Sequence, residues 1–388
     1  MGVGERRARL GRRQVLAAPA ATVESAVEGV VALHATDPVS LYLEARARAD
    51  GMQREDLQIA LYERRSLVRV LGMRRTLFVV GADLLPVVEA AAARALAAPE
   101  RRRVARWLEA EDVAADGVAY LHRLEDETAV ALVGFGSDGA PASDIAAVVP
   151  GLQTQIVLNR GKRYEGTVSV SSRVLLLLSM EGRAVRGRPR GSWISTQYRW
   201  VSAAAWLAHT VDLPSVDEAS AELARRWLGA FGPATFEDLK WWTGWTVAQT
   251  RRALALLSPT EVDLGHTTGL VLQSDEAPVT EPDPWIALLP ALDATTMGWK
   301  ERDWYLGEHA TALFDRNGNA GPTIWCDGRV VGGWAHRADG RIAVRLLEDI
   351  GAEAAAAVDA EAAALQAWLA DTRFTPRFRT PLERELTA

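Results

Sequence analysis

The stretch SVDEASAELARRWLGAFGPATFEDLKWWTGWTVAQTRRALALL, residues 215–257, carries the clearest folding signal in this chain. Two pairs in it have capping-box spacing and predict helix starts, namely Ser215 with Glu218 and Thr246 with Gln249. Residues 235–242 predict a short helix between them, which ends at the turn Thr243-Gly244-Trp245. Residues 261–273 then predict a β-hairpin. Helix, turn, helix and hairpin in this order are typical of a winged-helix unit.

Two earlier segments repeat this order of helices followed by a hairpin. The first predicts helices over residues 23–34, from Pro38 and over 54–65, and a hairpin over 66–80 that turns at 72–75. The second, from about residue 128, predicts helices over 143–149 and 170–181 and a hairpin over 183–201 that turns at 187–191. A charged helical segment over residues 83–115 joins the two.

The last hundred residues predict a different structure. Residues 274–284 hold three prolines and four acidic residues and predict a linker. Short strands are then predicted over residues 285–289, 310–314, 323–326, 329–334 and 342–346, followed by a helix over 352–369 and a basic tail over 373–379. The strands favour a small antiparallel β-barrel.

The fold class expected from these patterns is therefore α+β. We predict four parts: a winged helix with a helical extension over residues 1–115, winged helices over 116–205 and 206–274, and over 285–388 the barrel with its helix and tail.

Composition narrows the classes of protein that remain. The chain has 388 residues, of which 48% are hydrophobic, enough for several cores. The single cysteine, Cys326, excludes an intrachain disulfide, and the six histidines form no metal-binding pair, so no metal and no cofactor is expected. The sequence has no apolar run long enough to span a membrane and no secretory signal, so we expect no membrane partner and a cytoplasmic protein.

Positive charge is concentrated in one part of this acidic chain, whose net charge is −6. Residues 160–199 hold nine cationic and two acidic side chains, a net charge of +7. Such a segment favours contact with nucleic-acid phosphates, although a solvated loop has the same composition. The candidate DNA-binding residues are Lys162, Arg163, Arg186, Arg188, Arg190 and Arg199, with Arg74 and Arg75 in the first hairpin.

The segment Leu33-His34-Ala35-Thr36-Asp37-Pro38 places an imidazole, a hydroxyl and a carboxylate at a predicted helix-to-helix junction. A helix N-terminus offers unpaired N–H groups, and beside it His34 and Thr36 could hold a water molecule. Structural roles are equally open, because His34 continues an apolar stripe and Asp37 before Pro38 is a typical N-cap. We predict His34, Thr36 and Asp37 as catalytic candidates.

Four stretches carry a resemblance to a known family. They are residues 33–38 (LHATDP), 70–78 (VLGMRRTLF), 288–293 (LLPALD) with 298–302 (GWKER), and 324–334 (IWCDGRVVGGW). In this order they make the chain resemble the AlkZ-like bacterial DNA glycosylases of the winged-helix superfamily.

The resemblance implies a C-shaped molecule of three tandem winged helices and a β-barrel around duplex DNA. It implies that bulky N-alkylated purines are excised without a metal or organic cofactor, for repair or for self-resistance to a genotoxic natural product. The family's catalytic motif, Gln-x-Gln or Gln-x-Asp, falls on His34 and Thr36, with Asp37 adjacent, and neither glutamine is present here.

Two functions remain open from the sequence. The first is a monofunctional glycosylase that releases N7-alkylguanine or N3-alkyladenine adducts from double-stranded DNA, acts as a monomer and associates with the nucleoid when bound to DNA. The second is a winged-helix DNA-binding protein without chemistry, either a transcription regulator or a damage sensor, because a fold does not determine a function.

Overall fold

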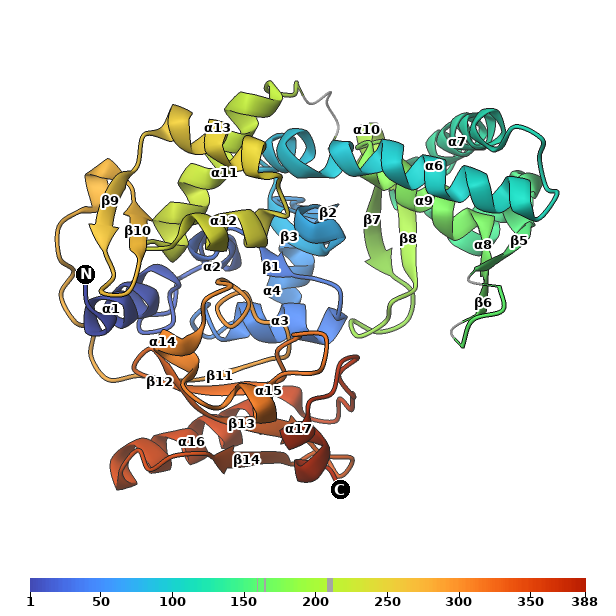
Figure 1. Ribbon diagram of the computed structural model, residues 1–388. Helices are drawn as coiled ribbons and strands as arrows, with labels where there is room; N and C mark the ends of the chain where they lie inside the picture. The colour runs from blue at the N-terminus through green and yellow to red at the C-terminus, as the bar shows by residue number, and fades with distance from the viewer. Residues whose placement is uncertain (159, 164, 208–211) are drawn as a thin grey trace.

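The computed structural model describes residues 1–158, 160–163, 165–207 and 212–388. Within these ranges the chain is a mixed α+β protein whose strands form five separate antiparallel sheets, as the α+β prediction requires. In Figure 1 the long helix α6 (Arg94–Ala110) runs along the top of the molecule, and the C-terminal sheet lies at the bottom. None of the helices in these ranges is both long and apolar enough to cross a membrane.

The first group of elements corrects one prediction. Its helices are α2 (Val23–Gly29), α3 (Pro38–Arg46) and α4 (Arg54–Gln58), the last extended by a π-helical turn to Glu63. Its strands are β1 (Leu33–His34), β2 (Leu67–Leu71) and β3 (Leu77–Gly81), in the order β1-β3-β2. The predicted helix over residues 23–34 is wrong beyond Gly29, because Val31 adopts a φ of 66° and the next residues pair with β3.

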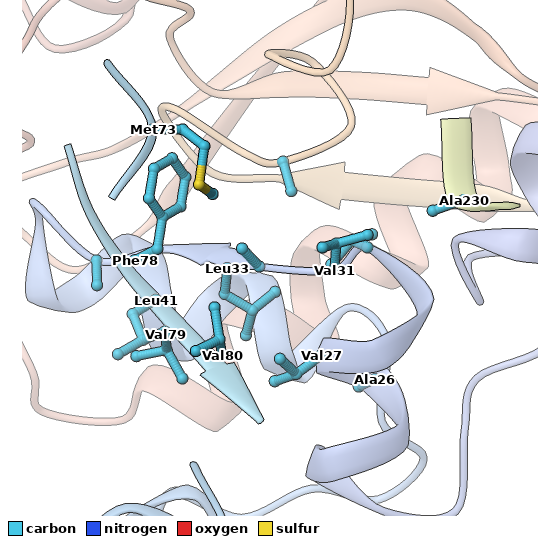
Figure 2. Packing of buried hydrophobic residues seen from close by; sticks show 14 of the residues in the cluster. Ala26, Val27, Val31, Leu33, Leu41, Met73, Phe78, Val79, Val80 and Ala230 are labelled. Atoms are coloured by element: carbon cyan, nitrogen blue, oxygen red, sulfur yellow. The ribbon is translucent and has the colours of Figure 1, made fainter. Parts of the chain in front are cut away.

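The pairing of β1 with β3 places its two side chains on opposite faces. Leu33 lies opposite Val79, and His34 lies opposite Phe78. Since directly paired residues share a face and neighbours alternate, Leu33 and Val79 face one way and His34 and Phe78 the other. Figure 2 shows Leu33 and Val79 in the buried cluster with Val27, and Phe78 pointing away from them.

The second group contains both helices that the sequence predicts and several elements that it does not. The predicted ones are α8 (Ala142–Val148), α9 (Val170–Met180) and the hairpin of β7 (Ala184–Pro189) and β8 (Tyr198–Ser202). The others are α7 (Gly117–Gly134), the two-residue strand β4 (Ala140–Pro141) beside β8, the hairpin of β5 (Gln155–Leu158) and β6 (Gly166–Ser169), and α10 (Ala203–Leu207). Because β7 continues to Pro189, the hairpin turns over residues 190–197 and not at 187–191.

Between the first two groups the charged segment is helical, as predicted. It consists of α5 (Leu85–Val88), a π-helical stretch over Glu89–Ala93, and α6.

The third group confirms the predicted helices and hairpin of residues 215–273. It consists of α11 (Val216–Phe231), α12 (Phe236–Thr243), α13 (Val247–Leu257), β9 (Thr260–Asp263) and β10 (Thr268–Val271). Ser215 and Glu218 form the full capping box, whereas at Thr246 only the hydroxyl accepts a bond, from the Gln249 N–H. The turn after α12 needs a left-handed residue, and Gly244 supplies it with a φ of 76°.

The C-terminal part corrects two predictions. The four strands β11 (Ile286–Leu289), β12 (Thr323–Cys326), β13 (Arg329–His336) and β14 (Ile342–Leu346) pair only in chain order, so they form an open sheet and not a barrel. Helix α16 (Ala352–Leu369) covers this sheet through Leu365 and Leu369, so the apolar face is buried without closure. The predicted strand over residues 310–314 is wrong, because Ala310–Leu313 is the short helix α15, and α14 (Asp303–Leu306) and α17 (Pro381–Leu386) were not predicted.

The N-terminal helix α1 (Val3–Arg13) contacts parts of the chain far away in sequence. Arg9 donates to the carbonyls of Asp275 and Ala277 in the predicted linker, and Gln14 donates to the carbonyl of Ala230 in α11. These bonds attach the linker to the body of the protein.

Candidate nucleic-acid interface

A hollow of about 730 Å³ opens between the first group, the second group and the C-terminal tail, residues 373–379. Thr36 lines it together with three of the predicted DNA-binding residues, Arg75, Arg186 and Arg190. Arg377 of the tail, which the sequence analysis did not select as a site residue, also lines it. Leu71, Leu77, Leu175 and Trp200 supply apolar surface, so the hollow combines arginines with a wall that can contact a flat, apolar group.

Thr36 is held at the hollow by the elements on either side of it. Before it, the Ala35 N–H donates to the carbonyl of Leu77 at 2.8 Å, which extends the pairing of β1 with β3. After it, Asp37 caps α3, because its Oδ1 accepts the N–H of Val39 at 3.0 Å. The N-cap prediction for Asp37 is thereby confirmed.

The other oxygen of Asp37 is also engaged. Its Oδ2 accepts the backbone N–H of Arg377 at 3.3 Å, which ties the tail to the start of α3. Asp37 is 9% exposed, and both of its carboxylate oxygens accept backbone hydrogen bonds. Asp37 is therefore suited to fix the position of Thr36 and the tail beside the hollow.

His34 lies behind the hollow and does not line it. The rings of His34 and Phe78 pack in a T-shaped, edge-on arrangement, with 5.6 Å between their centroids. The Nδ1 of His34 is buried without a hydrogen-bond partner among the described residues. Burial, and secondarily the charge of Arg74, lowers the pKa of His34 to about 3. The imidazole is therefore neutral at pH 7.

The lowered pKa gives a prediction about stability. Because the unfolded chain binds a proton at His34 near its ordinary pKa and the folded chain does not, the free energy of unfolding should fall as the pH drops from about 6.5 towards 3. Substitution His34→Phe should make this fall smaller, since phenylalanine does not titrate. Urea unfolding of both proteins across this pH range tests it, and equal pH dependences would contradict a buried neutral His34.

The arginines of the hollow differ in whether their side chains already contact another group of the protein. The Arg190 side chain is exposed and has no partner in the part of the chain that the structure describes. The Arg186 guanidinium lies 4.5 Å from the ring centroid of Trp200, and although burial lowers its pKa to about 10, it stays cationic at pH 7. Arg75 is paired with Glu100 at 2.7 Å. Of these three, Arg190 is thus the side chain most available to a phosphate.

The remaining predicted DNA-binding residues lie outside the hollow. Arg74 stacks over Trp241 at 4.0 Å, Arg188 donates to Gln58 and Glu63, and Arg199 donates to the carbonyls of Asp138 and Gly139. Lys162 and Arg163 are exposed in the loop between β5 and β6, which belongs to a different sheet from β7 and β8. The basic segment over residues 160–199 is therefore not one continuous surface around the hollow.

The tip of the β7–β8 hairpin is attached to the rest of the protein. Trp193 lies at this tip. The centroid of its ring is 4.8 Å from that of Tyr42 in α3 and 6.0 Å from that of Trp368 in α16. The guanidinium of Arg54 stacks against both tryptophans. This packing holds the hairpin that carries Arg186 and Arg190 in place at the hollow.

A buried network beneath the motif was missed by the sequence analysis. Glu44 of α3 is fully buried, and its Oε2 accepts the backbone N–H of His34 at 3.2 Å. One helical turn later Arg48 forms two 2.8 Å hydrogen bonds with the carboxylate of Asp293, in one of the stretches that carry the family resemblance. Burial and the neighbouring charge of Asp293 raise the pKa of Glu44. The four-residue spacing of Glu44 in α3 and Arg48 just beyond its end is the only signal for this network in the sequence.

Metal chemistry was not expected, and the described ranges hold no group of three or more histidine, cysteine or acidic side chains arranged for a metal ion. One histidine, His209, lies outside these ranges.

Comparison with known proteins was made by family, sequence and structure. Residues 27–368 match the family described as "DNA glycosylase AlkZ-like". The chain is 29% identical over 170 residues to the interstrand DNA cross-link repair glycosylase of Streptomyces sahachiroi, a match that spans 42% of this chain and 45% of that protein. The solved structure of Streptomyces sahachiroi DNA glycosylase AlkZ is similar with a TM-score of 0.74 and 22% identity, over 95% of this chain and 96% of that one.

Proposed function

Since the chain belongs to the DNA glycosylase AlkZ-like family, we propose that it hydrolyses the N-glycosidic bond of bulky N-alkylated purines in double-stranded DNA. N7-alkylguanine and N3-alkyladenine adducts, including those of genotoxic natural products, are the substrate class. The product is an abasic site, and the role is repair or self-resistance. The match to the cross-link repair glycosylase covers less than half of either chain.

The chemistry requires little acid or base strength. A purine alkylated at a ring nitrogen carries a positive charge and leaves readily, so the protein needs to position a water molecule and stabilise the cationic sugar. We assign the positioning of water to the Thr36 hydroxyl at the hollow. Neutral His34 and the capping carboxylate of Asp37 hold this segment of backbone, and Asp37 adds negative charge near the sugar.

The elements around the hollow fit a DNA-binding architecture. We propose that the three groups of helices with their hairpins are winged helices over residues 1–115, 116–205 and 206–274, and that residues 285–388 form the fourth domain of a C-shaped monomer. Arg186 and Arg190 contact phosphates at the hollow. Arg74, Arg75, Arg188 and Arg199 support or flank this contact, and Lys162 and Arg163 contact DNA farther along the duplex.

One observation carries the proposal. Thr36, one of the two residues on which the family's catalytic motif falls, lines the same hollow as Arg75, Arg186, Arg190 and Arg377. A reactive position, cationic side chains and an apolar wall are thereby combined at one place, as an enzyme acting on a bulky modified base in DNA requires.

Base release from damaged DNA is the direct test. The protein is incubated with a duplex that carries one bulky N7-alkylguanine, and abasic sites are then cleaved with alkali. Strand breaks well above the spontaneous depurination of the same duplex are expected, and none with the unmodified duplex. If a panel of N7- and N3-alkylpurines gives no release while tight, salt-sensitive binding is retained, the glycosylase proposal fails.

A DNA-binding protein without chemistry is the second candidate. It is favoured because two residues of the motif already have structural roles: His34 is buried, and Asp37 caps α3 and bonds the tail. Neither glutamine of the family's motif is present. This function predicts a footprint on DNA without base release, and the same incubation distinguishes the two.

A further inference from the structure

A second cationic pocket, of about 490 Å³, lies on the other side of the tail. It is formed by the end of β13, the turn that follows it, the tail itself and α17. Three arginines from different segments line it, Arg337, Arg373 and Arg379. The proposed reaction does not use this pocket.

Two of these arginines keep their charge unneutralised. Arg337 donates through Nε to the carbonyl of Leu386 at 2.7 Å, and its two terminal nitrogens have no partner in the described ranges. Arg373 donates to backbone carbonyls, those of Ala370 at 2.9 Å and Thr372 at 3.0 Å among them, and no carboxylate in these ranges pairs with it. A guanidinium bonded only to carbonyls still carries its full charge.

The acidic groups near the pocket do little to offset this charge. Glu383 is the one carboxylate among the described lining residues; it is 2% exposed and lies 3.3 Å from the Nε of Arg379. Burial raises the pKa of Glu383 to about 7, so at neutral pH it carries only part of a negative charge. Asp339 in the adjacent turn is paired with Arg341 at 2.7 Å.

One wall of the pocket is flat and apolar. The His336 ring is stacked on Phe374 at a centroid separation of 4.5 Å, and burial lowers the pKa of His336, which keeps it uncharged at neutral pH. Its Nε2 is buried without a hydrogen-bond partner in the part of the chain that the structure describes. The pocket thus combines unpaired cationic donors with a rigid wall.

We propose that this pocket binds a phosphate group, and specifically a backbone phosphate of the duplex on one side of the damaged nucleotide. An arginine whose planar guanidinium has free N–H donors is the side chain best suited to bind phosphate oxygens. The source of the phosphate rests on the proposed function and follows from the tail, because Arg377 lines the hollow and Arg373 lines this pocket. These residues are four positions apart, at most about 14 Å along an extended chain. At a rise of about 3.4 Å per nucleotide, this separation of the two backbone positions corresponds to roughly four nucleotides, so we place the phosphate beyond the second nucleotide from the lesion.

The test compares two double variants that remove the same charge. Arg337→Gln/Arg373→Gln removes the two unpaired guanidinium groups, and the matched control Arg316→Gln/Arg345→Gln removes two exposed arginines that do not line the pocket. The dissociation constant is measured against salt concentration for a long duplex with a central adduct, and for a short one that extends about two base pairs beyond it. For the long duplex the pocket variant should show a slope of log K against log salt that is less steep by about one to two units. The control should keep the wild-type slope, and the short duplex should show no difference.

A third measurement separates the two sources of phosphate. Inorganic phosphate is added to the DNA-free wild type and pocket variant, and the melting temperature is followed. An unchanged slope together with phosphate-dependent stabilisation of the wild type alone would overturn the DNA contact and show a site for a free anion. No effect in either measurement would overturn the pocket as a phosphate site. Base release from the short duplex reports the proposed function separately, because the pocket variants should leave it unchanged.

Discussion

Replacing Asp293 with alanine is expected to lower the free energy of unfolding by about 3–5 kcal/mol. Arg48 and Asp293 are both fully buried, and the two bonds between them are each 2.8 Å. Removing the carboxylate leaves the Arg48 guanidinium buried without its hydrogen-bonded counter-ion, although its bonds to the carbonyl of Glu44 and the hydroxyl of Thr295 remain and the buried Glu44 carboxyl group stays nearby. An uncompensated buried charge costs far more than the contacts that are lost with it.

Urea unfolding followed by tryptophan fluorescence measures this effect. The matched control is Asp283→Ala, an exposed aspartate in the linker, which should change stability by less than about 0.5 kcal/mol. The double variant Arg48→Met/Asp293→Leu should be more stable than Asp293→Ala alone, because it removes both charges together. A double variant as unstable as the single one would show that packing and not charge dominates here.

Replacing Thr36 with valine is expected to lower the rate of base release by about 100-fold, the scale for losing one group that positions a reactant. Valine has nearly the shape of threonine and lacks only the hydroxyl, so the hollow and the cap at Asp37 should remain. Thr36→Ser, which keeps the hydroxyl, should stay within a few-fold of wild type. Single-turnover kinetics on the adduct-bearing duplex measure the chemical step apart from binding.

Two controls make this result interpretable. Thr268→Val makes the same change at an exposed position of β10, away from the hollow, and should release base at the wild-type rate. Binding of Thr36→Val to the intact duplex should match wild type, since the arginines are unchanged. If Thr36→Val releases base as fast as wild type, another group must position the water and the assignment of Thr36 is wrong.

The elements that the sequence predicted well are those whose signals are local. Capping at Ser215 and Asp37 involves atoms two or three residues apart, and both caps occur as expected. The hairpin over residues 66–80 also forms as expected, because its two strands are adjacent in the chain. The same holds for most of the helix-and-hairpin order on which the α+β prediction was based.

The errors lie where a distant partner decides the local structure. His34 looked helical by periodicity, yet it lies in a strand because β3, more than forty residues later, pairs with it. Residues 310–314 were too short for periodicity to distinguish strand from helix. The predicted barrel is an open sheet because α16 covers its apolar face.

For the candidate site, the sequence by itself determined the motif at residues 33–38, the cap at Asp37 and the excess of arginine in and around the β7–β8 hairpin. Tertiary structure alone decided which of these residues meet. It placed Thr36 with Arg186, Arg190 and Arg377 at one hollow, put the His34 side chain on the face of β1 that it shares with Phe78, and set Glu44, Arg48 and Asp293 beneath the motif. The physical reason is that caps and turns are satisfied by neighbours in the chain. Buried charges, strand partners and shared surfaces depend instead on residues that only folding brings together.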